Sequence, residues 1–365
     1  MVKLYSVSLF LSWKCNFACA HCGFSCGPDR EEKMSLEDAA GYIDAAAENP
    51  DLQMIAFSGG EPFLYFDEVK TLMAHSYSKG LQGGITTNGY WASGYKETLA
   101  VLTGLQEIGL KNIITSFDDY HNRFVPAENI SNIIRAASEL GIHCGLNILM
   151  TKRSRINGVN AGALLGVDLD RLVDEEKLRL TVSSPILVGN AVESCAPEDR
   201  VTYYADKLLG HPCPFILGCP IITPTGALYA CCGFADASSH GPASIAYVGE
   251  LKEHGFSRLF DNLSHNLMYN IIYEYGPYIL VRMALEANPE LVANNGHVAN
   301  PSITANPGFT VRTEFVSDCD VCGEISTNPA LRKAVGEVLM QLGRQRGDDA
   351  MLRGGDAMLR SDNRM

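Results

Sequence analysis

Apolar runs and amphipathic stretches alternate along the first 210 residues of the chain. Short runs of mostly apolar residues fit buried strands, and apolar positions that recur every three or four residues fit helices. The predicted strands cover residues 3–11, 53–58, 82–87, 112–117, 143–150 and 179–187. The predicted helices between them cover residues 35–48, 66–78, 94–108, 127–140 and 169–176. Ser35, followed three residues later by Asp38, predicts an N-cap and an acidic first helical turn.

Strand–helix units in series predict parallel strands joined by right-handed crossovers. The six units are fewer than the eight of a closed barrel. We therefore expect an α/β domain over residues 1–210, built as a partial, open (β/α)6 barrel. Functional groups should lie on the loops that follow the carboxyl ends of the strands.

The alternation ends after about residue 210. Residues 221–223 and 227–231 predict a hairpin around the turn Pro224-Thr225-Gly226. Beyond it the sequence predicts helical structure within 255–287, a loop over 288–308, a last helix over 329–342 and a disordered tail over 343–365. We expect residues 211–342 to form a small α+β domain with a helical insert at about 233–318.

Composition narrows the class of protein. The 365 residues are 46% hydrophobic and 19% charged, which suits a large core. The net charge of −13 argues against a nucleic-acid partner or an anionic membrane surface. The N-terminus does not predict a signal peptide, and no apolar run is long enough for a membrane span. Twelve cysteines then favour metal or redox chemistry in a reducing cytoplasm over a disulfide framework.

Three cysteines directly follow the first predicted strand. Cys15, Cys19 and Cys22 have the spacing CxxxCxxC. Thiolates ligate iron–sulfur clusters, and three of them leave the fourth iron of a cubane without a protein ligand. The open coordination position predicts a site for a substrate or cofactor. The spacing assigns no role to Cys26.

This spacing resembles the signature of the radical S-adenosylmethionine (SAM) superfamily. The resemblance implies a partial barrel, a [4Fe–4S] cluster whose open iron binds SAM, and reductive cleavage of SAM to a 5′-deoxyadenosyl radical. It also implies a flavodoxin- or ferredoxin-like reductant.

Other strand ends carry residues that match the SAM site of the resembled family. Ser58-Gly59-Gly60-Glu61-Pro62 follows the second strand, where glycine lets the backbone approach a ligand and Glu61 offers an acceptor for an ammonium group. The resemblance implies SAM-site positions at Phe17, Gly59, Gly60, Glu61, Pro62, Thr87, Asn88, Ser116, Asp118, Asn147, Gly189 and Asn190.

A second set of cysteines lies beyond the predicted barrel. Its spacing resembles part of the cysteine pattern of SPASM and Twitch domains, and too few cysteines follow for two auxiliary clusters. The resemblance implies one auxiliary [4Fe–4S] cluster on Cys213, Cys231, Cys319 and Cys322. Cys219 could replace Cys213 or Cys232 could replace Cys231, and a tetrahedral zinc site is the alternative.

Two thiols are left over by this assignment. Cys232 and Cys219 are candidate hydrogen-atom donors to a substrate radical, as in some radical SAM epimerases. We expect a peptide substrate that is epimerised, crosslinked or oxidised in natural-product biosynthesis. The alternatives are oxidation or epimerisation of an aminocyclitol or sugar, and a non-catalytic electron-transfer or sensor protein.

Overall fold

The computed structural model describes residues 3–234, 243–291, 311–312 and 314–346. Contacts between Cα atoms divide the chain into two compact units. One contains Tyr5–Val201 and Ile221–Ala227, and the other contains Met1–Leu4, Thr202–Pro220 and Leu228–Met365. In the described part of the chain no helix is both long and apolar enough to cross a membrane.

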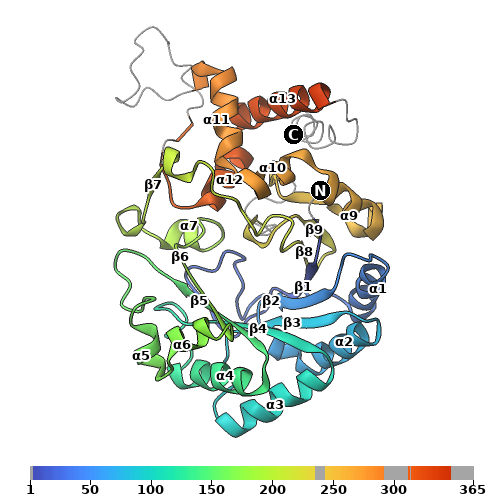
Figure 1. Cartoon of the computed structure of the whole chain (residues 1–365), viewed down its shortest axis with the longest axis vertical. Helices are drawn as coiled ribbons and strands as arrows, with labels where there is room; N and C mark the ends of the chain where they lie inside the picture. Colours follow the sequence, from blue (N-terminus) through green and yellow to red (C-terminus); the bar gives the residue numbers. More distant parts are fainter. Residues whose placement is uncertain (1–2, 235–242, 292–310, 313, 347–365) are drawn as a thin grey trace. The chain divides into compact units, whose positions relative to one another are not determined.

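The first unit contains the predicted parallel sheet, in the strand order β1 to β6 (Figure 1). The strands are β1 Ser6–Ser12, β2 Met54–Gly59, β3 Gln82–Thr86, β4 Leu110–Ser116, β5 His143–Leu149 and β6 Leu178–Ser183. Each strand pairs in parallel with the next one along the chain. The α/β fold class and the open parallel arrangement are thus confirmed, because β6 lies at an edge of the sheet.

Helices α1 to α6 connect these strands and pack along one side of the sheet (Figure 1). They are α1 Leu36–Ala47, α2 Phe66–Ser78, α3 Tyr95–Glu107, α4 Ala127–Leu140, α5 Ala161–Leu165 and α6 Leu169–Asp174. Ser35 caps α1 as predicted, since its side chain accepts a hydrogen bond from the Asp38 N–H. The short helix α5 was not predicted.

The predicted hairpin is present and begins with β8, Ile221–Ile222. The Thr223 N–H donates to the Ala227 carbonyl across the turn, and Gly226 adopts a φ of 93° that favours glycine. The sequence did not predict that β8 also pairs in parallel with β1. This pairing covers the edge of β1 opposite β2, so β1 has a neighbour on both sides.

The second unit is mostly helical in its described residues. It contains β7 Tyr203–Tyr204, β10 Tyr247–Glu250, β11 Glu314–Phe315, α8 Leu251–His254, α9 Phe256–His265, α10 Leu267–Tyr275, α11 Tyr278–Ala287, α12 Asp318–Thr327 and α13 Pro329–Arg346. β9, Ala227–Tyr229, begins at the boundary between the units.

Two helix boundaries in this unit differ from the prediction. The helical pattern over 255–287 forms three helices. Asn266 ends α9 and caps α10, and Gly276, at φ 78°, ends α10 before Pro277. The last helix continues to Arg346, so residues 343–346 are not part of a tail. The rest of the predicted tail and most of the loop over 288–308 lie outside the described residues.

Candidate active site

The loop after β1 folds back on the strand that precedes it. The Cys15 N–H donates to the Gly27 carbonyl at 3.0 Å, and the Gly27 N–H donates to the Trp13 carbonyl at 3.3 Å. Further along, the Met34 N–H donates to the Leu11 carbonyl at 2.7 Å. These hydrogen bonds close a loop whose two ends lie at the carboxyl end of β1. The fold predicts functional groups at this end of the strands.

The three cysteines of this loop line one cavity in the first unit. The Phe17 N–H donates to Cys15 Sγ and the Cys26 N–H donates to Cys22 Sγ, each at 3.4 Å. Asn88 Nδ2 lies 3.6 Å from Cys15 Sγ. Donors directed at sulfur stabilise thiolates, the form that ligates metals. Three thiols that share a cavity, two of which already receive such donors, fit the predicted cluster.

Cys26 interacts with the cluster loop, although the spacing assigned it no role. Its thiol is hydrogen-bonded to Cys22, and this contact is the main cause of a Cys22 pKa of about 6, well below the usual thiol value. Burial raises the pKa of Cys15 to about 11. Without a bound metal, Cys22 therefore ionises more readily than Cys15. In the sequence, the CxxxC spacing from Cys22 to Cys26 could have indicated the contact between these two thiols.

Gly59 and Gly60 let two backbone segments approach each other. A Cβ at Gly60 would lie 1.9 Å from the Lys14 carbonyl oxygen, and one at Gly59 would lie 2.4 Å from the Ser12 carbonyl oxygen. The Gly60 N–H donates to the Ser12 carbonyl and the Glu61 N–H donates to the Lys14 carbonyl. The sequence predicted a close approach to a ligand here. The structure shows that the glycines admit the start of the cysteine loop.

Glu61 joins the ends of β2 and β3. One carboxylate oxygen accepts from the Phe63 N–H at 3.0 Å and from Thr87 Oγ1 at 2.8 Å, and the other accepts from the Asn88 N–H at 2.7 Å. The side chain is buried. Burial raises its pKa to about 7 even though three donors oppose the rise. The second oxygen has one lone pair left for a further donor.

The cavity beside the three thiols is lined from four strand ends. Besides the three cysteines it is lined by Phe17, His21, Phe24, Cys26, Ser58, Gly59, Gly60, Thr86, Thr87, Asn88, Ser116 and His121. Six predicted SAM-site residues are among these: Phe17, Gly59, Gly60, Thr87, Asn88 and Ser116. Phe17 also stacks on Phe124, with ring centroids 5.0 Å apart.

Asp118 is buried and is not among the lining residues. Its oxygens accept from the backbone N–H groups of Tyr120 and His121 and lie 2.9 Å from His121 Nδ1. Burial opposes ionisation of Asp118, but the bonds and charge of His121 outweigh it and hold the pKa below its usual value. Asp118 thus positions His121, which does line the cavity and which the sequence did not single out as a SAM-site residue.

His21 lies beside His121, with ring centroids 4.7 Å apart. Burial and the neighbouring His121 lower the pKa of His21 to about 4, so His21 is neutral at pH 7. Its Nδ1 is buried without a hydrogen-bond partner. In the described residues, His21, Asp118 and His121 are the one group of three or more possible metal ligands whose ligand atoms all lie within 4.8 Å of one another.

Four other predicted SAM-site residues contact protein outside the cavity lining. Pro62 begins a short 3₁₀ helix after Glu61, and the Asn147 carbonyl accepts from the Phe117 N–H. Asn190 Nδ2 donates to the Cys19 carbonyl at 3.1 Å, and its N–H donates to the Cys22 carbonyl at 3.0 Å. A Cβ at Gly189 would lie 2.6 Å from the Cys22 carbonyl oxygen. Gly189 and Asn190 therefore hold the backbone of the cysteine loop.

The second set of cysteines lies within the second unit. Cys319 and Cys322 lie on the first turn and a half of α12, a helix that the sequence analysis did not predict, and they precede the predicted last helix α13. Charges at Cys213, Cys231 and Cys319 all raise the pKa of Cys322, after burial as the main cause. A Cβ at Gly233 would lie 3.2 Å from Cys319 Sγ and 3.9 Å from Cys231 Sγ. The four predicted ligands are thus close neighbours.

The two remaining thiols form a pair. Cys232 is hydrogen-bonded to Cys219, and this contact, followed by burial, raises the pKa of Cys232 well above the usual thiol value. Cys231 and Cys319 act on Cys232 with weaker electrostatic effects. The two candidate hydrogen donors therefore lie together, next to the four-cysteine set.

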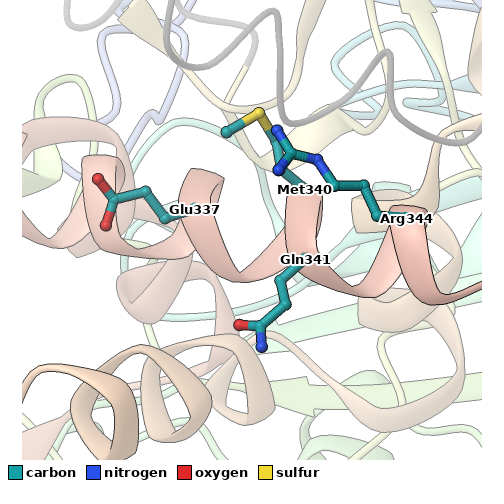
Figure 2. Close-up of a pocket in the computed structure, with 4 residues that line it drawn as sticks. All are labelled: Glu337, Met340, Gln341 and Arg344. Atoms are coloured by element: carbon teal, nitrogen blue, oxygen red, sulfur yellow. The ribbon is translucent and has the colours of Figure 1, made fainter.

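A separate surface hollow lies along α13. Figure 2 shows the four side chains that line it, Glu337, Met340, Gln341 and Arg344. They follow the three- and four-residue spacing of one helix face. The four lining residues include no cysteine and no group of metal ligands.

Comparison with known proteins identifies the first unit. Residues 11–154 match the model of the radical SAM superfamily. The protein YydG of Bacillus subtilis (strain 168), which is named as a peptide biosynthesis protein, is 26% identical over 330 residues, covering 88% of this chain and 91% of YydG.

Two solved structures are also similar. BtrN, solved in complex with AdoMet and 2-DOIA, has 15% identity and a TM-score of 0.46, covering 84% of this chain and 99% of BtrN. SuiB of Streptococcus suis, bound to its precursor peptide SuiA, has 16% identity and a TM-score of 0.46, covering 66% of this chain and 62% of SuiB.

The match to the superfamily model runs from the end of β1 to just beyond β5 and includes the cysteine loop and the residues that line the cavity. Residues 11–154 therefore form a radical SAM domain. That family implies SAM and one [4Fe–4S] cluster as cofactors. The cavity lined by Cys15, Cys19 and Cys22 is where the described residues fit them.

Proposed function

We propose that this chain is a radical SAM enzyme that modifies a peptide in natural-product biosynthesis. The observation that carries the proposal is the cavity shared by Cys15, Cys19 and Cys22, with polar groups of three further strand ends around it. The peptide is proposed because the relative that matches 88% of the chain is named for peptide biosynthesis. When bound, the cluster and SAM supply a 5′-deoxyadenosyl radical that takes a hydrogen atom from a substrate carbon.

The proposed roles follow from the positions of the residues. Cys15, Cys19 and Cys22 would hold the cluster. Glu61 is buried and is not among the lining residues, but the carboxylate oxygen that accepts from the lining residue Asn88 has one lone pair left, which would accept from the SAM ammonium group. Thr87 and Asn88 fix the Glu61 carboxylate by hydrogen bonds. Phe17, Gly59, Gly60 and Ser116 would contact SAM directly, whereas Pro62, Asp118, Asn147, Gly189 and Asn190 would act by positioning.

The second unit is proposed to be a Twitch-type domain with one auxiliary [4Fe–4S] cluster. Cys213, Cys231, Cys319 and Cys322 are the proposed ligands, supported by their mutual proximity. Anaerobically reconstituted protein should contain about eight irons per chain, and Cys319→Ser should lower this to about four. Tightly bound zinc at a content unaffected by iron reconstitution would instead identify a zinc site.

Epimerisation is the proposed reaction, because two non-ligand thiols lie beside the four-cysteine set. Either Cys232 or Cys219 would return a hydrogen atom to the substrate radical on the opposite face. We further propose a flavodoxin- or ferredoxin-like reductant and a cytoplasmic location. Crosslinking or oxidation of the peptide would need no such donor.

The test measures 5′-deoxyadenosine and product in anaerobic, reduced D₂O buffer. Reconstituted protein receives SAM alone, SAM with a pool of short linear peptides, or SAM with aminocyclitol glycosides. We expect 5′-deoxyadenosine to increase with peptides and one solvent deuterium to appear in the peptide, since thiols exchange with D₂O. Cys219→Ala and Cys232→Ala should retain SAM cleavage, and one of them should lose deuterium incorporation. An increase with glycosides alone would refute the peptide proposal, and no increase with an intact cluster would favour electron transfer or sensing.

A further inference from the structure

Trp91 lies on the loop between β3 and α3 and is not among the residues that line the cavity. Helix α4 holds this loop on both sides of the tryptophan. The buried Asn129 side chain donates to the Tyr90 carbonyl at 3.1 Å, and the buried Asn132 side chain donates to the Ala92 carbonyl at 3.0 Å. The backbone around Trp91 is thus anchored in the first unit, so the indole ring has a defined position.

The indole N–H is directed at the Thr87 hydroxyl. Trp91 Nε1 donates to Thr87 Oγ1 at 3.0 Å, and the Gly89 N–H donates to the same oxygen at 3.1 Å. Both N–H groups can only donate, whereas a hydroxyl has two acceptor lone pairs and one proton. The two donors fill the lone pairs of Thr87. Its single proton therefore remains for Glu61 Oε1, which lies 2.8 Å away.

The indole ring also supports the other donor to this carboxylate oxygen. The ring stacks on Phe63, with centroids 4.1 Å apart and planes 13° from parallel. The Phe63 N–H is the second donor to Glu61 Oε1. Trp91 therefore contacts both residues that donate to Oε1, Thr87 through its N–H and Phe63 through its ring. With Oε1 occupied, the free lone pair of the carboxylate is the one on Oε2, beside the Asn88 N–H.

We propose that Trp91 is a positioning residue for SAM. It orients the Thr87 hydroxyl, which fixes Glu61 so that the free lone pair on Oε2 meets the SAM ammonium group. The clause on SAM rests on the proposed function of Glu61. Without the indole N–H, one lone pair of Thr87 is empty and the hydroxyl is free to rotate. SAM binding must then order the hydroxyl and the carboxylate, which weakens the binding.

The experiment measures SAM affinity by equilibrium dialysis of the anaerobically reconstituted holoprotein. No reductant is added, so SAM is bound but not cleaved. Trp91→Phe keeps an aromatic ring beside Phe63 and removes the N–H. Its Kd for SAM should rise about two- to tenfold, the effect of one neutral hydrogen bond. Tyr90→Phe is the matched control, because it removes a hydrogen bond of the same loop, from the Tyr90 hydroxyl to the Phe63 carbonyl, and should leave the Kd unchanged.

Variants of Thr87 show whether Trp91 acts through the hydroxyl. Thr87→Ser retains the hydroxyl, so adding Trp91→Phe to it should weaken SAM binding by the same factor as in the wild type. Thr87→Val lacks the hydroxyl, so adding Trp91→Phe to it should cause no further loss. A deaminated SAM analogue, which lacks only the ammonium group, should bind equally to the wild type and Trp91→Phe. A merely structural role of Trp91 would weaken binding in all of these cases.

Three results would each overturn the proposal. They are an unchanged SAM affinity of Trp91→Phe, an equal loss of affinity in the Thr87→Val background, and an equal loss for the deaminated analogue. Iron content shows whether each variant has folded and assembled its cluster. If Trp91→Phe takes up less iron than the wild type, benzothienylalanine at position 91 replaces it in the same measurements, because this residue has the shape of tryptophan with sulfur in place of the N–H.

Failure of this proposal is distinguishable from failure of the proposed function. The expected affinities without 5′-deoxyadenosine from any substrate would retain the role of Trp91 in SAM binding and refute the radical enzyme. Peptide-dependent formation of 5′-deoxyadenosine, together with an unchanged SAM affinity of Trp91→Phe, would do the reverse.

Discussion

Glu61 provides a prediction in which stability and SAM binding change in opposite directions. Its carboxylate is fully buried with two backbone N–H donors and the Thr87 hydroxyl. The pKa is raised from 4.5 to about 7 by burial. The perturbation is Glu61→Gln, which retains the shape and most acceptor capacity of the side chain but cannot ionise.

The sign of the pH effect follows from this direction. A carboxyl whose folded-state pKa exceeds its unfolded value binds its proton more tightly when folded. The stability that it contributes is therefore present at pH 4.5 and below, and it is lost as the pH rises through 7. A rise from 4.5 to about 7 corresponds to about 3 kcal/mol at ~1.4 kcal/mol per pKa unit.

The assay is urea unfolding of the cluster-free, reduced protein at pH 5 and pH 7.5. The free energy of unfolding of Glu61→Gln, relative to the wild type, should be about 2 kcal/mol higher at pH 7.5 than at pH 5, because part of the stabilisation by Glu61 is already lost below pH 5. Glu107→Gln, an exposed position at the end of α3, is the matched control and should show no such change. An equal pH dependence of Glu61→Gln and the wild type would refute the reasoning.

SAM binding, in contrast, should be weakened by Glu61→Gln if Glu61 accepts a hydrogen bond from the SAM ammonium group. A hydrogen bond between charged groups contributes ~1.5–3 kcal/mol, so Glu61→Gln should weaken SAM binding about ten- to a hundredfold. Equilibrium dialysis with the reconstituted protein measures this. Unchanged SAM affinity would mean that Glu61 only joins the ends of β2 and β3.

Two further predictions concern the frame around the cavity. Gly60→Ala should prevent assembly of the cluster, because its Cβ would lie 1.9 Å from the Lys14 carbonyl oxygen, whereas Gly27→Ala, with nothing within 4 Å, should reconstitute with normal iron content. Normal iron content in both variants would contradict the close approach of Gly60 to the Lys14 carbonyl. Asp118→Asn should destabilise the protein by about 3 kcal/mol by urea unfolding, since a buried carboxylate bonded to the His121 ring and to backbone N–H groups is lost. Asp67→Asn, at an exposed position, should change the stability little. Because the pKa of Asp118 is lowered, this stabilisation should disappear as the pH falls below about 4, and a loss that is unaffected by acid would contradict it.

The sequence by itself determined the parallel sheet and the metal-binding loop. Apolar runs separated by amphipathic helices leave few topologies, because parallel strands need right-handed crossovers. The order β1 to β6 was therefore predictable, and so was the place of Cys15, Cys19 and Cys22 after β1. The hairpin turn at Gly226 was predictable for the same kind of local reason, a positive φ that favours glycine.

Only the tertiary structure decided which side chains meet. The sequence could not show that Gly60 leaves room for the Lys14 carbonyl. It also could not show that Asp118 is hydrogen-bonded to His121 instead of facing the cavity, or that the Cys26 thiol is hydrogen-bonded to Cys22. These contacts depend on distances between loops from different strands, which periodicity does not encode. The hydrogen bond from the Leu217 N–H to the Ala230 carbonyl is another case, because it joins segments of different elements and places Leu217 at a φ of 61° that no local propensity favours.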